Sequence, residues 1–102
     1  MAACSVDDTK SPQFDKLRRR WKRDFPNIDS DLSEAFAAIS KDITACKARR
    51  YQSGRENTEI YKYRQNSKDV RRGQNYGWRI YALYDKKAGV MYPIIVYPKT
   101  EW

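Results

Sequence analysis

Two stretches of the chain, Ile60-Tyr61-Lys62-Tyr63-Arg64 and Gly77-Trp78-Arg79-Ile80-Tyr81, decide the fold. Side chains that alternate in character with a period of two are typical of a half-buried β-strand. If the two strands are neighbours, Lys62, Arg64 and Arg79 converge on one face of the sheet. Converging cations on a rigid sheet predict a polyanion site, and RNA phosphate is the polyanion that we expect.

The strand pattern continues through the second half of the chain. We expect strands at 59–64, 77–85 and 90–97, with a hairpin turn at 85–89 and the last strand in the centre of the sheet. In the strand at 77–85, the side chains of Trp78 and Ile80 fall on the face opposite to Arg79 and Tyr81. The polar segments at 47–57 and 66–75 predict loops.

The first half of the chain predicts two helices. Ser11-Pro12 combines a capping hydroxyl with a proline at the first helical position, so the first helix begins here and ends near Phe25. Asp31 and Glu34 have the spacing of a capping box in the second helix. The apolar stripe of that helix has intervals of four and three and comprises Ile28, Leu32, Phe36, Ile39, Ile43 and Cys46.

These elements, with a short strand at 6–9, predict an α+β fold. Their order is strand, helix, helix and then three antiparallel strands, which places both helices on one face of the sheet. The two helices are joined by a short turn, so we expect them to pack as an antiparallel hairpin. A chain of 102 residues has room for one compact domain.

Composition narrows the classes of function. The chain has 21 Lys and Arg against 13 Asp and Glu, a formal net charge of +8, which predicts an acidic partner such as nucleic acid, an anionic membrane surface or an acidic protein. It has no histidine, which excludes a Ser-His-Asp triad, a His-ligated zinc and a His-pair nuclease mechanism. We expect no metal and no other cofactor. No apolar run spans a bilayer and no secretory signal opens the chain, so we expect a cytoplasmic protein without membrane contact.

The motifs also occur in an order that belongs to a known family. They are Tyr61-Lys62-Tyr63-Arg64, Arg71-Arg72-Gly73, Gly77-Trp78-Arg79-Ile80-Tyr81 and Tyr97-Pro98-Lys99. Together they resemble the motifs of the RelE/ParE toxin superfamily of bacterial toxin–antitoxin systems. The resemblance implies one RelE-like domain over residues 1–102, with an N-terminal strand and a helical hairpin packed on an antiparallel sheet. Family members usually continue into a C-terminal helix, and we expect this chain, which ends at Trp102, to lack it.

RelE-like toxins cut mRNA in the ribosomal A site, and the resemblance implies the same metal-independent attack of a 2′-hydroxyl on the adjacent phosphate. The reaction needs a base, positive charge at the phosphorane and an acid for the leaving oxygen. Arg79 is the candidate for stabilising the phosphate, and we expect its side chain to be exposed on the sheet. Lys62 is the candidate base, because the like charges of Arg64 and Arg79 favour its neutral amine. Further candidates are Arg64 for holding substrate phosphate, Tyr81 for stacking on a base or positioning the hydroxyl, and Lys99 and Glu101 for the acid or an alternative base.

Basic residues outside the strands are candidates for further RNA contacts. They are Arg18, Arg19, Arg20 and Lys22 in the first helix and Arg71 and Arg72 in the loop at 66–75. The run at 18–20 also fits a solvated helix face. The expected partners are mRNA, the ribosome and an acidic antitoxin protein, and the oligomeric state is left open.

Two other functions stay open at this point. A ParE-like gyrase inhibitor would share the fold, although Lys62 and Arg64 favour the RelE type. A non-catalytic RNA-binding module would need only the fold and the charge, and the expected lack of the C-terminal helix favours it.

Overall fold

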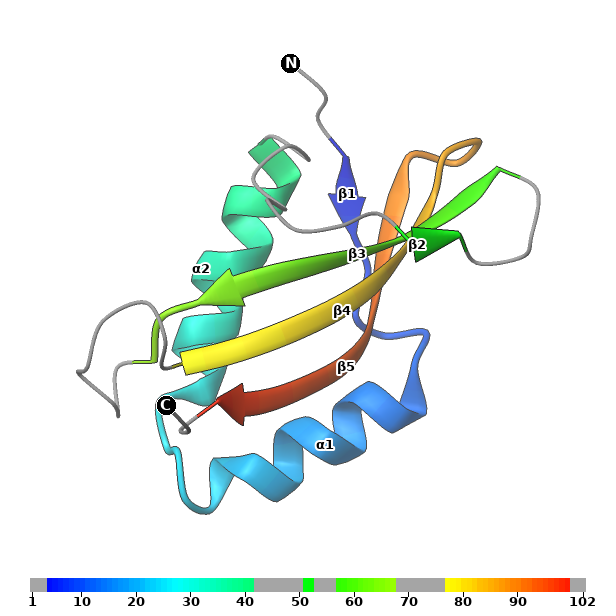
Figure 1. Ribbon diagram of the computed structural model, residues 1–102. Helices are drawn as coiled ribbons and strands as arrows, with labels where there is room; N and C mark the ends of the chain where they lie inside the picture. Colours follow the sequence, from blue (N-terminus) through cyan, green and yellow to red (C-terminus); the bar gives the residue numbers. More distant parts are fainter. Residues whose placement is uncertain (1–3, 42–50, 53–56, 68–76, 100–102) are drawn as a thin grey trace.

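Five strands and two helices form the part of the chain that the computed structural model describes, which is residues 4–41, 51–52, 57–67 and 77–99. The fold class is α+β, as predicted. In chain order the elements are β1 (Ser5–Val6), α1 (Pro12–Lys22), α2 (Ile28–Lys41), β2 (Tyr51–Gln52), β3 (Thr58–Gln65), β4 (Gly77–Asp85) and β5 (Val90–Lys99). Figure 1 shows α1 running along β5 and α2 crossing one face of the sheet.

The strands form one sheet in the order β1-β5-β4-β3-β2. All neighbours are antiparallel except β1, which pairs with β5 in parallel through Ser5 and Val6. The expected strands at 59–64, 77–85 and 90–97 are therefore confirmed, with the ends of β3 and β5 slightly extended. The expectation that β5 is the central strand was wrong, because β4 holds that place and β1 covers only the start of β5.

The segment at 47–57 was predicted as a loop, and this was wrong at Tyr51–Gln52. These two residues form β2, which pairs with Ile60 and Glu59 of β3. A two-residue strand leaves too short a stretch for a period-of-two pattern to be visible in the sequence. The rest of the predicted loop at 47–57 and most of that at 66–75 lie outside the described residues.

Both helices cover the same face of the sheet, as the sequence predicted. The core contains Trp78 and Ile80 of β4 and Val96 of β5, which pack against Phe14 of α1 and Leu32 of α2. A second cluster joins Ile39, Ala82 and Met91 near β1. The alternation of β4 is thereby confirmed, since Trp78, Ile80 and Ala82 all point into the core.

The two helix starts differ in how well they were predicted. Ser11 caps α1, because its Oγ accepts a hydrogen bond of 3.2 Å from the backbone N–H of Phe14, and Pro12 is the first helical residue. The capping box at Asp31 and Glu34 was wrong, since α2 already begins at Ile28. Asp31 is instead buried in the first turn of α2, where its Oδ2 accepts a 3.0 Å hydrogen bond from Trp78 Nε1.

Helix length also bears on the membrane. In the described part of the chain, neither helix combines the length and the apolar character that crossing a bilayer requires.

Candidate functional site: the open face of the sheet

The face of the sheet opposite the helices carries the predicted cations. Strand register places its side chains in rows across β3, β4 and β5. We call this surface the open face; its rows are Ile60–Leu83–Tyr92, Lys62–Tyr81–Ile95 and Arg64–Arg79–Tyr97, and Lys99 follows at the end of β5 opposite Gly77. Residues that are direct partners in a sheet lie on the same face with their Cβ atoms about 5 Å apart. The register therefore brings Lys62, Arg64, Arg79 and Tyr81 together, as the sequence predicted.

Arg79 is the most unusual residue of the open face. It was expected to be an exposed side chain, and this was wrong, because it is only 1% exposed. The alternation of β4 fixes the face on which Arg79 lies but does not say how much its neighbours cover that face. Burial lowers the pKa of Arg79, and the charge of Arg64 lowers it further, while Tyr97 and Tyr81 act in the opposite direction. Its Nη1 lies 3.5 Å from the carbonyl oxygen of Trp78.

Arg64 and Arg79 are thus two like charges in directly opposite positions of an antiparallel pair. Such pairs destabilise a sheet unless something compensates them. Arg64 is exposed and Arg79 is buried, so an anion that approaches this row meets the guanidinium of Arg64 first. The row can bind an anion through Arg64, with the charge of Arg79 close behind it.

Lys62 and two tyrosines form an aromatic and cationic group beside this row. Lys62 Nζ lies 5.6 Å from the centroid of the Tyr81 ring. The Tyr81 ring stacks on the Tyr97 ring, with a centroid distance of 6.3 Å and an angle of 21° between the ring planes. A cation above an aromatic face is attracted by the ring quadrupole, so this contact uses the ammonium of Lys62. The geometry suits Lys62 as a fixed positive charge beside a stacking surface better than as a proton acceptor.

A bulge in β5 sets which of its side chains reach the open face. The register shifts between Tyr81 and Ala82, whose partners are Ile95 and Pro93, so Ile94 is the extra residue. Pro93 consequently points into the core, while Ile95 and Tyr97 are 38% and 36% exposed. Ile95 and Tyr97 were not among the predicted site residues. A period of two places both of them on the same face as the predicted site residue Lys99, and this signal could have identified them.

Gly77 closes the cationic end of the open face. Its φ is +124°, and a Cβ at this position would overlap the carbonyl oxygen of Gln65 at the end of β3. Only glycine adopts this backbone conformation without strain and allows the close approach. Gly77 therefore lets β4 begin directly beside β3, two residues before Arg79, and lies opposite Lys99 of β5. Lys99 is exposed at the rim of the cluster.

The predicted RNA contacts of α1 are not on the open face, and most of them are engaged in ion pairs. Arg18 pairs with Asp15 at 2.6 Å and with Asp29 at 2.7 Å, and Lys22 pairs with Asp29 at 2.7 Å. Arg19 pairs with Asp15. Arg20 lies over the Trp21 ring instead. The remaining candidates, Arg71, Arg72 and Glu101, lie outside the described residues.

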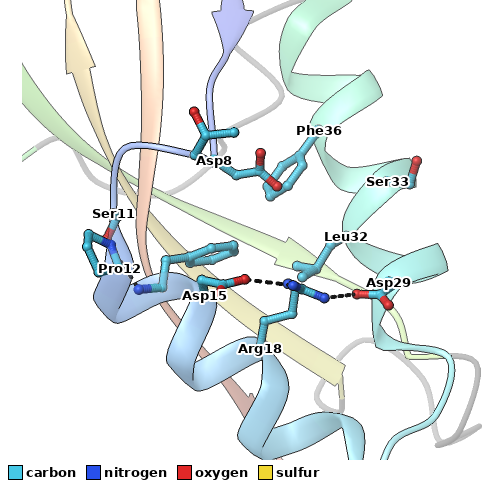
Figure 2. A pocket seen from close by; sticks show the side chains of 11 residues that line it. Asp8, Ser11, Pro12, Asp15, Arg18, Asp29, Leu32, Ser33 and Phe36 are labelled. Atoms are coloured by element: carbon cyan, nitrogen blue, oxygen red, sulfur yellow. Dashed lines mark hydrogen bonds and ion pairs between the residues drawn. The ribbon is translucent and has the colours of Figure 1, made fainter.

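The ion pairs of α1 border a groove on the helical side of the molecule. Figure 2 shows Arg18 between Asp15 and Asp29, with Leu32 and Phe36 of α2 above them in this view. The groove has a volume of about 610 Å³. The Arg18 hydrogen bond lowers the pKa of Asp15, and the Lys22 hydrogen bond lowers that of Asp29. Because these charges neutralise one another, the groove offers an ionic ligand less than the open face does.

Comparisons with known proteins give no assignment of function to the open face. No family model, no curated protein and no solved structure matched the chain. The open face therefore has to be interpreted from its own arrangement of charges and rings.

Proposed function

We propose that the open face binds RNA and that the protein is a RelE-like toxin, an mRNA endonuclease that acts on the ribosome. The proposal extends to a cytoplasmic location and to an acidic antitoxin that holds the toxin inactive. It is supported by the motif order in the sequence, by the α+β fold and by a net charge of +8. The observation that carries it is the row in which Arg64 lies opposite Arg79 on the open face.

The row of Arg64 and Arg79 favours RNA because like charges in directly opposite positions are unfavourable in a sheet. Two arginines in directly opposite positions repel each other, and the burial of one of them adds a desolvation penalty. A phosphate bound on this row would place negative charge beside both guanidinium groups, and the exposed Arg64 can bind its oxygens through paired, charge-assisted hydrogen bonds. Tyr97 of this row stacks on Tyr81 of the neighbouring row, and the two rings suit an RNA base.

The proposed reaction divides its tasks among these residues. A 2′-oxygen attacks the adjacent phosphorus, its proton passes to a base, and the 5′-oxygen leaves with a proton from an acid. Arg64 holds the phosphate, and the charge of Arg79 stabilises the phosphorane from behind. Lys62 contributes positive charge beside Tyr81. Among the residues that the structure describes, Lys99 at the rim of the open face is the candidate proton donor. Glu101 stays a candidate base from the sequence.

The test is expression of this chain from a tightly controlled promoter, with growth and primer extension on a reporter mRNA followed together. We expect growth arrest with cuts inside translated codons. Arg64→Gln should relieve both effects, whereas Lys87→Gln, which removes an exposed cation in the β4–β5 turn, should leave both unchanged. Arrest without cuts would contradict the endonuclease and point to another target such as gyrase.

Two observations favour a second candidate, an RNA-binding module without cleavage. Arg79 is buried, so it reaches the phosphate only through its charge, and Lys62 is engaged with the Tyr81 ring. Both features serve binding more directly than proton transfer. RNA binding by the purified protein, together with unimpaired growth and an intact reporter mRNA, would favour this candidate over the toxin.

A further inference from the structure

Three cations of α1 stand apart from the ion pairs of that helix. Lys16, Arg20 and Arg23 follow one another at intervals of four and three, so they lie along one flank of the helix. Arg23 continues the helical backbone just beyond Lys22, with φ −59° and ψ −46°. All three are exposed, and none forms an ion pair with a carboxylate of residues 4–41, 57–67 or 77–99. We call Lys16, Arg20 and Arg23 the basic stripe.

The basic stripe faces away from α2. Arg18 and Lys22 reach Asp29 of α2, which fixes the flank of α1 that faces this helix. Successive helical residues are separated by about 100°, so positions 16, 20 and 23 fall on the other flank. Like charges three and four residues apart destabilise a helix, and the stripe has two such pairs. The protein thus neutralises one flank of α1 and leaves three repelling charges on the other.

Arg20 connects the basic stripe to the open face. Its guanidinium carbon lies 5.4 Å from the centroid of the Trp21 ring. Trp21 in turn donates a 3.2 Å hydrogen bond from Nε1 to the carbonyl oxygen of Val96 in β5. Val96 lies between Ile95 and Tyr97, the two exposed apolar side chains of the open face. The Trp21 ring therefore holds the Arg20 side chain beside the edge at which the open face ends.

We propose that the basic stripe of Lys16, Arg20 and Arg23 is a second RNA contact, which holds the sugar-phosphate backbone of a strand that crosses the open face and leaves it over β5. This inference rests on the proposed function, because it extends the path of the same RNA. The path runs across the strands, from Lys62 of β3 past Arg79 and Tyr97 to Arg20 of α1. The stripe gives affinity without reading sequence, as contacts to phosphate do.

The chemistry of the stripe favours RNA over an acidic protein. Stable protein interfaces depend on apolar or aromatic anchors that become buried at their centre. The apolar residues nearest to the stripe on α1, Leu17 and Trp21, pack against the core instead of pointing outward. A stripe of cations without an apolar anchor matches a phosphate backbone, whose binding needs little besides positive charge.

The test compares two triple variants with the same change in net charge. Lys16→Gln/Arg20→Gln/Arg23→Gln removes the stripe. Lys10→Gln/Lys41→Gln/Lys87→Gln removes three other exposed cations, none of which forms an ion pair with a described carboxylate. Binding of the full chain to a fluorescent single-stranded RNA of about 20 nucleotides is measured by anisotropy at several salt concentrations, with Lys62→Gln/Arg64→Gln as the open-face variant. Circular dichroism checks that each variant is folded.

Loss of three phosphate contacts lowers the slope of log K against log salt by about 2, which is about 100-fold in affinity at 0.1 M salt. We expect this loss in the stripe variant and a loss below about fivefold in the control, which changes only the long-range field. If the stripe variant behaves like the control while the open-face variant loses binding, the stripe is not a contact and the proposed function stands. If neither variant loses more than the control, both proposals fail. Full RNA affinity in the stripe variant with loss of binding to an acidic antitoxin would make the stripe a protein surface and overturn the inference.

Discussion

Trp78 and Arg79 are neighbours in β4 and both are fully buried, yet their surroundings differ in kind. The Trp78 indole donates its N–H to Asp31 at 3.0 Å and meets the Phe25 ring edge-on at a centroid distance of 5.0 Å. Arg79, on the other face, lies opposite the like charge of Arg64. The first side chain has a carboxylate acceptor and an aromatic neighbour, whereas burial and the charge of Arg64 both lower the pKa of the second.

The difference indicates that one face of the sheet stabilises the fold and that the other carries the candidate binding site. The helix-covered face of β4 contributes to stability, since the buried Trp78 Nε1 has a carboxylate acceptor. The open face instead places two like charges, Arg64 and Arg79, in directly opposite positions, an arrangement that by itself does not stabilise a sheet. Charge that is retained at an energetic cost is typical of a binding or catalytic site. The predictions below test whether stability and function separate between the two faces.

The largest expected effect comes from the helix-covered face. Trp78→Ala removes a buried indole and leaves Asp31 without that donor, so the free energy of unfolding should fall by about 4 kcal/mol. Trp78→Phe keeps part of the ring and should lose about 2 kcal/mol, chiefly through the lost hydrogen bond. Urea denaturation followed by circular dichroism gives both values. A loss below about 1 kcal/mol for Trp78→Ala would contradict the contrast between the two faces, because the core would then not depend on the Trp78–Asp31 hydrogen bond.

The second effect is expected on the open face and in binding instead of stability. Lys62→Gln/Arg64→Gln removes two cations beside the Tyr81–Tyr97 stack, which should lower the salt slope of RNA binding by about 1.4 and the affinity at 0.1 M salt by about 25-fold. The unfolding midpoint should stay unchanged or rise, since a like-charge contact is removed. RNA binding that does not depend on salt in the wild-type protein would count against a phosphate site altogether.

A smaller effect on binding should come from Arg79. In contrast to Trp78, we expect its substitution to change RNA affinity more than the stability of the fold. Arg79→Met keeps the aliphatic stem and removes a buried charge, so the free energy of unfolding should change by about 1 kcal/mol or less. RNA affinity at 0.1 M salt should fall by up to about fivefold, the effect of one cation. Equilibrium unfolding and anisotropy on the same sample measure both. A variant that unfolds while Trp78→Ala stays folded would reverse the roles of the two faces.

The smallest effect is expected in the ion pairs between α1 and α2. Hydrogen bonds from Lys22 and Arg18 lower the pKa of Asp29 in the folded protein. A lowered folded-state pKa contributes stability at pH values above the unfolded-state pKa, and this stability is lost as the pH falls below about 4. Asp29→Asn should therefore lower the melting temperature at neutral pH by about 2 °C or less, because the ion pairs of Asp29 are screened by solvent. In acid the substitution should leave the melting temperature unchanged. An equal shift at pH 6 and pH 3 would contradict this assignment.

The local rules of the sequence identified the elements and the faces of the strands. Ser11-Pro12 located the start of α1, and the period-of-two pattern assigned Trp78 and Ile80 to the core. Asp31 was misread because a carboxylate three residues before Glu34 fits a cap, whereas its actual partner, the Trp78 indole, is 47 residues away in the chain. Local spacing carries no information about a partner that the tertiary fold supplies.

The sequence predicted the cations of the candidate site, but neither the burial of Arg79 nor the contribution of Ile95 and Tyr97 from β5. The alternation of β3 and β4 put Lys62, Arg64 and Arg79 on one face, and their register confirms that they are neighbours. The burial of Arg79 depends on what surrounds it in three dimensions, which a one-strand pattern does not encode. The exposure of Tyr97 depends in addition on the bulge at Ile94, an irregularity that shifts the register by one residue.

The central claim is that RNA binds on the open face, and photo-crosslinking tests it without prior choice of residues. The full chain is crosslinked to single-stranded RNA by ultraviolet light, and the modified peptides are mapped by mass spectrometry. We predict crosslinks at Tyr81 and Tyr97 of β4 and β5, and none in α2. Crosslinks concentrated in residues 28–41, with β4 and β5 unmodified, would contradict the claim and move the site to the helical side.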